Sequence, residues 1–422
     1  MTTTTNLIDA IGVKKTDGTR KLTIKDETEN YTVYRIPLEK LFYNDRNGRI
    51  ATYISKCIAD GNSMERSNLD EYNNVLHGFI RESNSNALDA TKENINRFGQ
   101  RLPGVVLQDG RVIDGNRRFT CLRELKKEGE DVFFEAVILD TGNGIDDRDI
   151  KRLELNLQHG EERPVDYNAI DYLVDMYNDI VKNKMFTIED YVKSTNKNKK
   201  DIEMGVKKAL LMVQFLEFIN AKEQYFIARD MELDGPLQEC VSILNKEFKK
   251  QDFEKLSNSN FEDKNTQADY LRIRNALFTA IFTSRSEERG DLTRYIRQMG
   301  KSVIHSDNRE EFLEEYEEIV EEVYETLQEE DMVTSQTVKE IGKKLEEVRK
   351  EGTEIIDKVI EDTQITEARK KPVDLLNQAL KDLNRIDSDQ VKRLKGEDAK
   401  EFDLVLKEIK NALAEFGEAL EI

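Results

Sequence analysis

The spacing of apolar residues along the chain changes near residue 147. Before that point, short apolar runs closed by Asp-Gly turns predict strands at 102–107 and 112–113, and a longer apolar run predicts a buried strand at 132–140. Between these strands, residues 116–125 place apolar side chains at helical spacing. The pattern therefore predicts strand, turn, strand, a Gly-containing turn and a helix, followed by one more strand.

From residue 147 onward the helical period persists, beginning with a predicted helix at 147–158. Thr187 is a candidate cap for a short helix, a polar turn follows, and a second helix is predicted at 199–218. This cadence is typical of a helix-turn-helix. Farther along, apolar residues repeat every three or four positions, as in a packing seam: Phe312, Tyr316, Ile319, Val323 and Leu327.

These patterns predict an α+β N-terminal domain, an all-α region with the helix-turn-helix, and a helical C-terminal region able to form a coiled coil. A length of 422 residues also exceeds one ordinary domain. The predicted parts are a loosely ordered N-terminus at 1–30, an α+β domain at 31–146 with an insertion at about 57–90, a helical domain at 147–305 with the helix-turn-helix at about 187–218, and an acidic helical region at 306–422.

Charge and composition make some classes of function less favoured but do not select one. The formal net charge of −20 argues against nucleic acid as a partner, because phosphate binding needs positive charge. The acidic excess lies largely in the C-terminal third, however, and residues 111–127 and 193–200 are locally basic. The sequence has no run of 18 apolar residues, no signal-peptide pattern and three scattered cysteines. We therefore expect a cytoplasmic protein with reduced thiols and no membrane partner.

The turn at Asp114-Gly115 is the first candidate site. A glycine at a strand-to-helix junction lets main-chain N–H groups approach an anion, and the helix N-terminus adds partial positive charge. Arg117 and Arg118 follow on the first helical turn and can fork onto phosphate oxygens. The alternative is an ordinary surface turn whose arginines are solvated or pair with carboxylates.

Three segments in order resemble the ParB/sulfiredoxin superfamily. LPGVVLQDGRVIDGNRRFTCLREL (102–125), followed by VFFEAVILD, resembles its nucleotide-binding core, and RIPLEKLFYNDRNGRI (35–50) resembles its opening segment. LELNLQHGEERPVDYNAIDYLVDMY (153–177) resembles its third box, after which the family keeps a helix-turn-helix. The resemblance implies a ParB/sulfiredoxin-like fold at 31–146 that binds CTP or ATP with Mg²⁺. The nucleotide-binding residues it implies are Asn47, Arg49, Gly115, Asn116, Arg117 and Arg118.

The sequence departs from the family pattern at several positions. The box that usually reads GERR reads GNRR at 115–118, and Cys121 stands at the usual small-residue position. The family's Glu-Asn pair, implied to hold magnesium and assist hydrolysis, becomes Leu155-Asn156. Asn156 remains an oxygen donor for Mg²⁺, whereas losing the carboxylate weakens the case for hydrolysis more than for binding. Sulfiredoxin chemistry is not expected, because its reactive cysteine would align with Asn116.

The predicted helix-turn-helix supplies candidate DNA contacts. In that geometry the N-terminal side chains of the second helix enter the major groove of double-stranded DNA. The candidates are Asn198, Lys199, Lys200 and Lys207. The alternative is an ordinary helical hairpin with a solvated lysine face. The C-terminal helices are expected to form a homodimer.

Two classes of function follow. The first is a ParB-like DNA-binding protein whose N-terminal domain binds the triphosphate and acts as a switch or clamp on DNA. The second is a nuclease or NTPase of a plasmid, phage or defence system, with Asp114 and Glu154 as catalytic, metal-binding carboxylates. A third is a degenerate core kept for protein interaction. Few carboxylates cluster in this window, which favours the first class over a two-metal nuclease.

Overall fold

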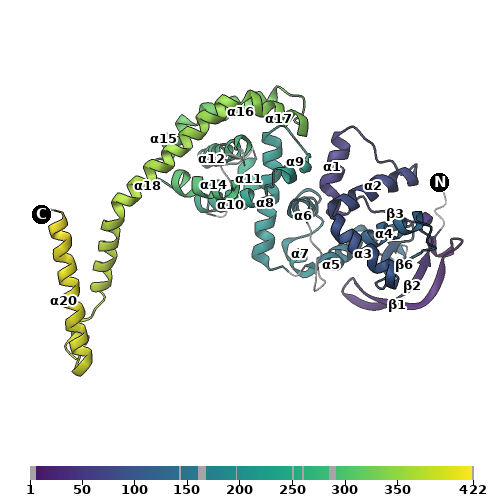
Figure 1. The fold of residues 1–422 in the computed structure, drawn as a ribbon, viewed down its shortest axis with the longest axis horizontal. Coiled ribbons are helices and arrows are strands. Elements are labelled where there is room, and N and C mark those ends of the chain that lie inside the picture. The colour runs from purple at the N-terminus through teal and green to yellow at the C-terminus, as the bar shows by residue number, and fades with distance from the viewer. Residues whose placement is uncertain are drawn as a thin grey trace. The chain divides into compact units, whose positions relative to one another are not determined.

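The structure is a computed structural model that describes residues 6–141, 144–159, 168–195, 197–249, 251–258, 261–284 and 291–420. The protein divides into two compact units, Met1–Asp357 and Lys358–Ile422, and the long helix α18 (Glu346–Leu383) crosses the boundary. The first unit contains a mixed α/β part and a larger helical part (Figure 1). This agrees with the predicted change of pattern near residue 147.

One sheet forms the centre of the N-terminal part. Its strands in the described chain are β1 (Lys14–Ile24), β2 (Glu27–Ile36), β3 (Phe42–Tyr43), β4 (Gly104–Leu107), β5 (Arg111–Asp114) and β6 (Phe134–Leu139), in the order β1-β2-β6-β4-β5-β3. β4 pairs parallel with β6 and β3 pairs parallel with β5, while the other neighbours are antiparallel. The strands predicted from the apolar runs at 102–107, 112–113 and 132–140 are confirmed.

Both faces of the central strands are covered, which explains why their sequences are continuously apolar. On β4, Val106 packs in one core together with Phe119 of helix α4 (Asn116–Lys127). Val105 points to the other face, into a core that includes Ile150 and Leu153 of helix α5 (Asp147–His159). The sheet therefore lies between α4 on one side and α5 on the other.

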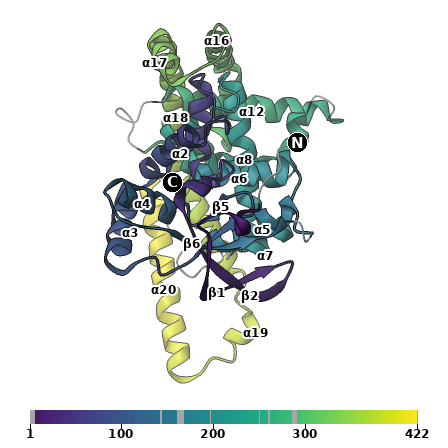
Figure 2. The ribbon, with the colours of Figure 1, turned by 90° about the vertical axis from the view of Figure 1, so that its right-hand side faces the viewer.

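Residues 14–36 form a long hairpin, whose first strand lies in the segment predicted to be loosely ordered (1–30). β1 and β2 are joined by Lys25 and Asp26, both with positive φ (53° and 65°), as in the two-residue turns that suit strand twist. Figure 2 shows the hairpin as a long curved ribbon. The pattern was missed because β1 is polar along most of its length and because its turn lacks the usual Asn-Gly or Asp-Gly signal.

Helices of the predicted insertion cover the α4 side of the sheet. α1 (Ala51–Ala59) is followed by α2 (Leu69–Ser83) and α3 (Ser85–Phe98), so the segment predicted as an insertion at about 57–90 overlaps three helices. Asn84 separates α2 from α3, and its side chain accepts a hydrogen bond from the main-chain N–H of Ala87 at 3.0 Å. A single asparagine cap thus makes two helices from this segment.

The helical part of the first unit follows α5. Its elements are α6 (Ala169–Met176), the π-helix η5 (Tyr177–Lys182), α7 (Ile188–Ser194), α8 (Lys199–Phe218), α9 (Tyr225–Asp230), α10 (Asp234–Glu247), α11 (Phe253–Ser257), α12 (Lys264–Thr283), α14 (Leu292–Met299), the π-helix η6 (Gly300–Ile304), α15 (Arg309–Glu315), α16 (Glu317–Gln328) and α17 (Ser335–Lys344). Thr187 caps α7 with a capping box that includes Asp190. The predicted helix pair at 187–218 is therefore present.

The helical part is joined to the sheet part through α1. The Asp171 carboxylate on α6 accepts a hydrogen bond from the Thr52 main-chain N–H at 2.9 Å. Arg229 on α9 donates to the Thr52 hydroxyl at 2.9 Å, and its guanidinium lies 4.1 Å from the centre of the Tyr53 ring. These contacts are buried or half-buried, so the two parts form one continuous body.

The apolar seam at 312–327 packs within its own chain. Phe312, Val323 and Leu327 are fully buried, and α16 packs on α12. Just beyond the seam, the Val333 main-chain N–H donates to the Asn220 carbonyl at 2.9 Å. This part of the predicted 306–422 region belongs to the first unit and is not an open dimerisation surface.

The second unit contains the C-terminal half of α18, then α19 (Ser388–Val391) at a turn of the chain and α20 (Gly396–Ala419) (Figure 2). Its helices expose a series of large apolar side chains: Ile365, Val373, Leu375, Leu376, Leu380, Ile386, Leu404, Val405, Leu413, Phe416 and Leu420. A search of the described helices for one long and apolar enough to span a membrane finds none.

Candidate functional site

A pocket of about 260 Å³ lies at the N-terminus of α4. Its walls come from five separated parts of the chain: the turn at 47–50, the α2–α3 pair, Leu102, residues 113–118, and the C-terminal end of α5. All six residues implied as nucleotide-binding line this pocket: Asn47, Arg49, Gly115, Asn116, Arg117 and Arg118. The fold thus brings together two segments that the sequence keeps more than sixty positions apart.

Gly115 makes the turn that opens α4 toward the pocket. Its φ of 97° is left-handed, and a Cβ at this position would lie 3.0 Å from Phe134 and 3.1 Å from the Arg118 guanidinium. Gly115 is also the N-cap residue, so no side chain caps the first N–H groups of α4. The helix therefore begins with uncapped N–H groups and a partial positive charge beside the pocket.

Asp114 and Arg118 form part of the pocket wall through an ion-pair bridge. The Asp114 carboxylate lies 2.7 Å from the guanidinium of Arg20 on β1 and 2.9 Å from that of Arg118. Arg118 also donates to the Leu102 carbonyl at 2.9 Å, and Arg20 donates to the carbonyl of Pro103 at 2.6 Å. The bridge ties β1, the 102–103 loop and α4 together, which gives Asp114 a structural role in this geometry.

Arg49 and Arg117 supply positive charge from two segments. Both line the 260 Å³ pocket and a smaller neighbouring pocket of about 40 Å³, whose other walls include Asp171 and Arg229 of the helical part. Asn47 holds the turn before Arg49, because its Oδ1 accepts a hydrogen bond from the Arg49 main-chain N–H at 3.2 Å. Asn47 therefore forms the turn and positions Arg49.

The segment that resembles the family's third box lies in different environments. Leu155, which the resemblance aligns with a glutamate, is buried in a core that includes Met176 and Tyr191, where an apolar side chain fits. Asn156 is half-buried on α5 and is absent from the walls of the 260 Å³ pocket. Glu154 lines a different pocket, and residues 160–167 of the box lie outside the described residues.

That second pocket, of about 910 Å³, contains a buried charge cluster that the sequence analysis did not single out. The Lys151 ammonium lies 3.3 Å from Asp175, 3.7 Å from Asp179 and 3.9 Å from Glu154. Tyr191 donates to Asp179 at 2.9 Å. Burial raises the pKa of Glu154 to about 7 and that of Asp179 to about 6, while the carboxylates raise the pKa of Lys151 against the opposing effect of its burial.

The aspartates of this cluster follow a pattern that can be recognised in the sequence. Asp171, Asp175 and Asp179 recur every four residues, so they lie along one face of α6 and η5, and Lys151 and Glu154 share a face of α5. Buried carboxylates at helical spacing opposite a lysine are a recognisable ion-pair pattern. The partner helix is not evident from the sequence alone, because its register depends on the tertiary fold.

The described residues of the pocket at α4 offer few ligands for Mg²⁺. Mg²⁺ in proteins usually takes one or two carboxylates besides phosphate oxygens and water. Among the described wall residues the carboxylate is Asp114, and it is paired with two arginines. Within the described parts of the chain, no group of three or more His, Cys, Asp or Glu side chains is placed to hold a metal ion.

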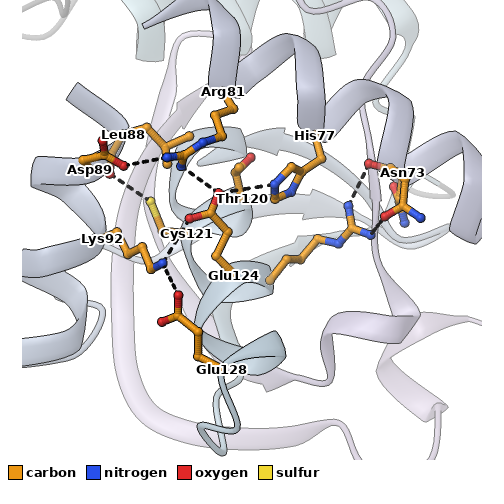
Figure 3. A network of polar contacts seen from close by, with 12 residues as sticks. Asn73, His77, Arg81, Leu88, Asp89, Lys92, Thr120, Cys121, Glu124 and Glu128 are labelled. Carbon is orange, nitrogen blue, oxygen red and sulfur yellow. Dashed lines mark hydrogen bonds and ion pairs between the residues drawn. The ribbon is translucent and has the colours of Figure 1, made fainter. Parts of the chain in front are cut away.

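A polar network fastens the insertion helices to α4 behind the pocket (Figure 3). The Glu124 carboxylate lies 2.8 Å from Arg81, 3.2 Å from Lys92 and 3.3 Å from His77, which come from α2 and α3. Cys121 is fully buried, donates to a main-chain carbonyl of α3 at 3.4 Å, and has its pKa raised to about 12 by burial. A buried, protonated thiol is a core residue and a poor nucleophile.

The residues predicted to contact DNA lie on two sides of α8. Asn198 caps the helix through the Asp201 N–H, and Lys199 and Lys200 are exposed on its first turn, where Lys199 pairs with Glu189 at 2.8 Å. Lys207 instead lies over the Phe253 ring at 4.6 Å and donates to Asn245 of α10. Asn198, Lys199 and Lys200 thus form an exposed, basic N-terminal end of α8. Lys207 instead packs between helices.

The comparisons with known proteins give no relative for this chain. No family model matches it, and neither a curated protein nor a solved structure matches it.

Proposed function

We propose that the protein is a ParB-like DNA-binding protein whose pocket at the N-terminus of α4 binds a nucleoside triphosphate, CTP or ATP, as a switch or clamp on DNA. The observation that supports this most is the convergence of the turn at 47–50 and the start of α4 on one pocket. Those are the two segments that resemble the family's nucleotide-binding boxes.

The chemistry of the pocket suits a triphosphate. Phosphate oxygens accept hydrogen bonds, and the uncapped N–H groups that follow Gly115 provide donors together with the favourable end of the helix dipole. Arg49 and Arg117 add charge from opposite segments. Asp114 and Arg118 hold the wall in place, and Mg²⁺ enters bound to the phosphates rather than to a preformed protein site.

DNA binding through α7 and α8 is the second part of the proposal. The start of α8 is exposed and carries Lys199 and Lys200. α8 packs on α6, whose Asp171 bonds to the start of α1 directly after the Arg49 turn. A nucleotide bound at Arg49 thus acts on the same rigid elements that hold the proposed DNA-contacting helix.

A titration of labelled CTP, ATP and GTP, each with Mg²⁺ and with and without duplex DNA, tests the proposal. We expect one nucleotide to bind, DNA to change its affinity, and Arg117→Ala to weaken binding at least tenfold through loss of a charge-assisted contact. Because Asp114, the carboxylate among the described wall residues, is already paired with two arginines, EDTA should weaken binding less than Arg117→Ala does. Arg97→Ala, an exposed arginine on α3, is the matched control. Absence of binding by all three nucleotides would refute the proposal.

The nuclease or NTPase alternative depends on Asp114 and Glu154 acting together. These carboxylates line different pockets, and Asp114 is neutralised by Arg20 and Arg118. The geometry therefore favours nucleotide binding over metal-dependent cleavage. Phosphate release or DNA nicking that is lost in Asp114→Ala would reverse this preference.

A further inference from the structure

Asn116 has a buried acceptor with no partner, at the centre of the proposed site. It is the first residue of α4, it lines the 260 Å³ pocket, and only 8% of its surface is exposed. Its side-chain oxygen Oδ1 is buried and accepts no hydrogen bond from the residues that the structure describes. Buried polar atoms in folded proteins almost always have partners, so this oxygen calls for a donor from outside the chain.

Several donors of the pocket wall are already engaged elsewhere. The Arg118 guanidinium donates to the Leu102 carbonyl and to Asp114. The Thr120 hydroxyl donates to the main-chain carbonyl of Asn116, and Gln158 donates to Glu154 at 3.1 Å. Recruiting any of these groups to Asn116 Oδ1 would break a bond that the fold already makes.

We propose that Asn116 accepts a hydrogen bond from a sugar hydroxyl of the bound nucleotide. This inference rests on the proposed function and specifies which class of phosphate compound the pocket selects. Ionised phosphate oxygens only accept hydrogen bonds, so a phosphate on the α4 N–H groups cannot satisfy a second acceptor. The donor must come from another group of the same ligand.

The position of Asn116 points to the sugar rather than to the base. Asparagine has a short side chain, and at the first position of α4 its oxygen stays close to the N–H groups proposed to hold phosphate. The sugar is the part of a nucleotide joined directly to the phosphates, and its hydroxyl groups are donors. The base lies one sugar ring farther away. Asn116 thus makes the pocket selective for ribonucleotides. It disfavours inorganic tripolyphosphate and nucleotides whose sugar lacks the 2′ and 3′ hydroxyl groups.

Three ligands and two variants test this assignment. The ligands are the nucleotide that binds most tightly among CTP, ATP and GTP, its 2′,3′-dideoxy analogue, and inorganic tripolyphosphate. Asn116→Leu removes the acceptor at nearly constant size, and Asn96→Leu changes an exposed asparagine on α3 as the matched control. Thermal unfolding establishes that each variant is folded. If Asn116→Leu fails to fold, Asn116→Ala replaces it.

We expect the wild type to bind the ribonucleotide about tenfold more tightly than the dideoxy analogue, as one buried hydrogen bond predicts. Asn116→Leu should abolish this difference while leaving tripolyphosphate affinity unchanged, and Asn96→Leu should retain it. Equal wild-type affinity for the two nucleotides, or a difference that survives in Asn116→Leu, overturns the assignment and leaves nucleotide binding intact. Failure of the wild type to bind any nucleotide refutes the assignment together with the proposed function.

Discussion

At the scale of single residues, Asp114 shows why a carboxylate beside a candidate site need not be catalytic. The sequence places it directly before the glycine turn, where a metal ligand would be expected. In the fold it bridges Arg20 of β1 and Arg118 of α4. Arg20 lies far away in the chain, within the segment predicted to be loosely ordered, so this partner could not be anticipated. The same bridge fixes the orientation of Arg118 in the pocket wall.

Asp114→Asn should therefore lower the free energy of unfolding. The buried guanidinium of Arg20 and the half-buried one of Arg118 would lose their charged partner, which costs about 1–3 kcal/mol. Urea unfolding followed by circular dichroism measures the change, and Asp89→Asn, whose side chain is 59% exposed in its pair with Arg81, is the control with little expected effect. An unchanged stability combined with lost nucleotide binding would instead assign Asp114 to the ligand.

At the scale of elements, the sequence predicted the helices and buried strands well and the tertiary partners poorly. The core strands and the 187–218 helix pair follow from local patterns, namely apolar runs, Asp-Gly turns and a threonine cap. β1 was not predicted, because a polar edge strand has no such pattern. The candidate residues of the pocket were predicted through resemblance, whereas the bridge to Arg20 and the contact of Arg229 with α1 depend on long-range packing.

The packing of α5 against α6 and η5 predicts a dependence of stability on pH. Burial raises the pKa of Glu154 from 4.5 to about 7, so the folded state binds this proton more tightly than the unfolded chain. The stabilisation that comes from this tighter proton binding is complete below pH 4.5 and is lost as the pH rises through 7. His77 and His305, whose pKa values burial lowers, act in the opposite direction. The test is therefore the difference between wild type and a variant.

Glu154→Gln should remove the contribution of this carboxyl group. As the pH rises from 5 to 8, the wild type should lose free energy of unfolding that Glu154→Gln does not lose. We expect this relative loss to be on the order of 2 kcal/mol. Urea unfolding at several pH values measures it. Asp147→Asn, an exposed carboxylate on the same helix, should give a nearly constant difference. A constant difference for Glu154→Gln would show that the proton is not held more tightly in the folded state.

At the scale of the whole molecule, the two units differ in how much surface they bury. After Thr363, the described residues include no buried side chain, although many large apolar ones are exposed there. We expect main-chain hydrogens of α20 to exchange rapidly at low protein concentration, because an isolated helix is marginal in water. If these helices dimerise, their exchange should slow as concentration rises, while exchange in the core strands stays unchanged. Concentration-independent protection of α20 would contradict self-association.

The contacts of Thr52 limit which segment of this protein could be transplanted into another protein. Its main-chain N–H is bonded to Asp171 and its hydroxyl to Arg229, both from the helical part. A chimera that transplants only residues 31–146 would leave that amide without its acceptor and would also lack Arg20, the partner of Asp114. A portable piece of this protein therefore has to include β1 and the helical part at least as far as Arg229 on α9.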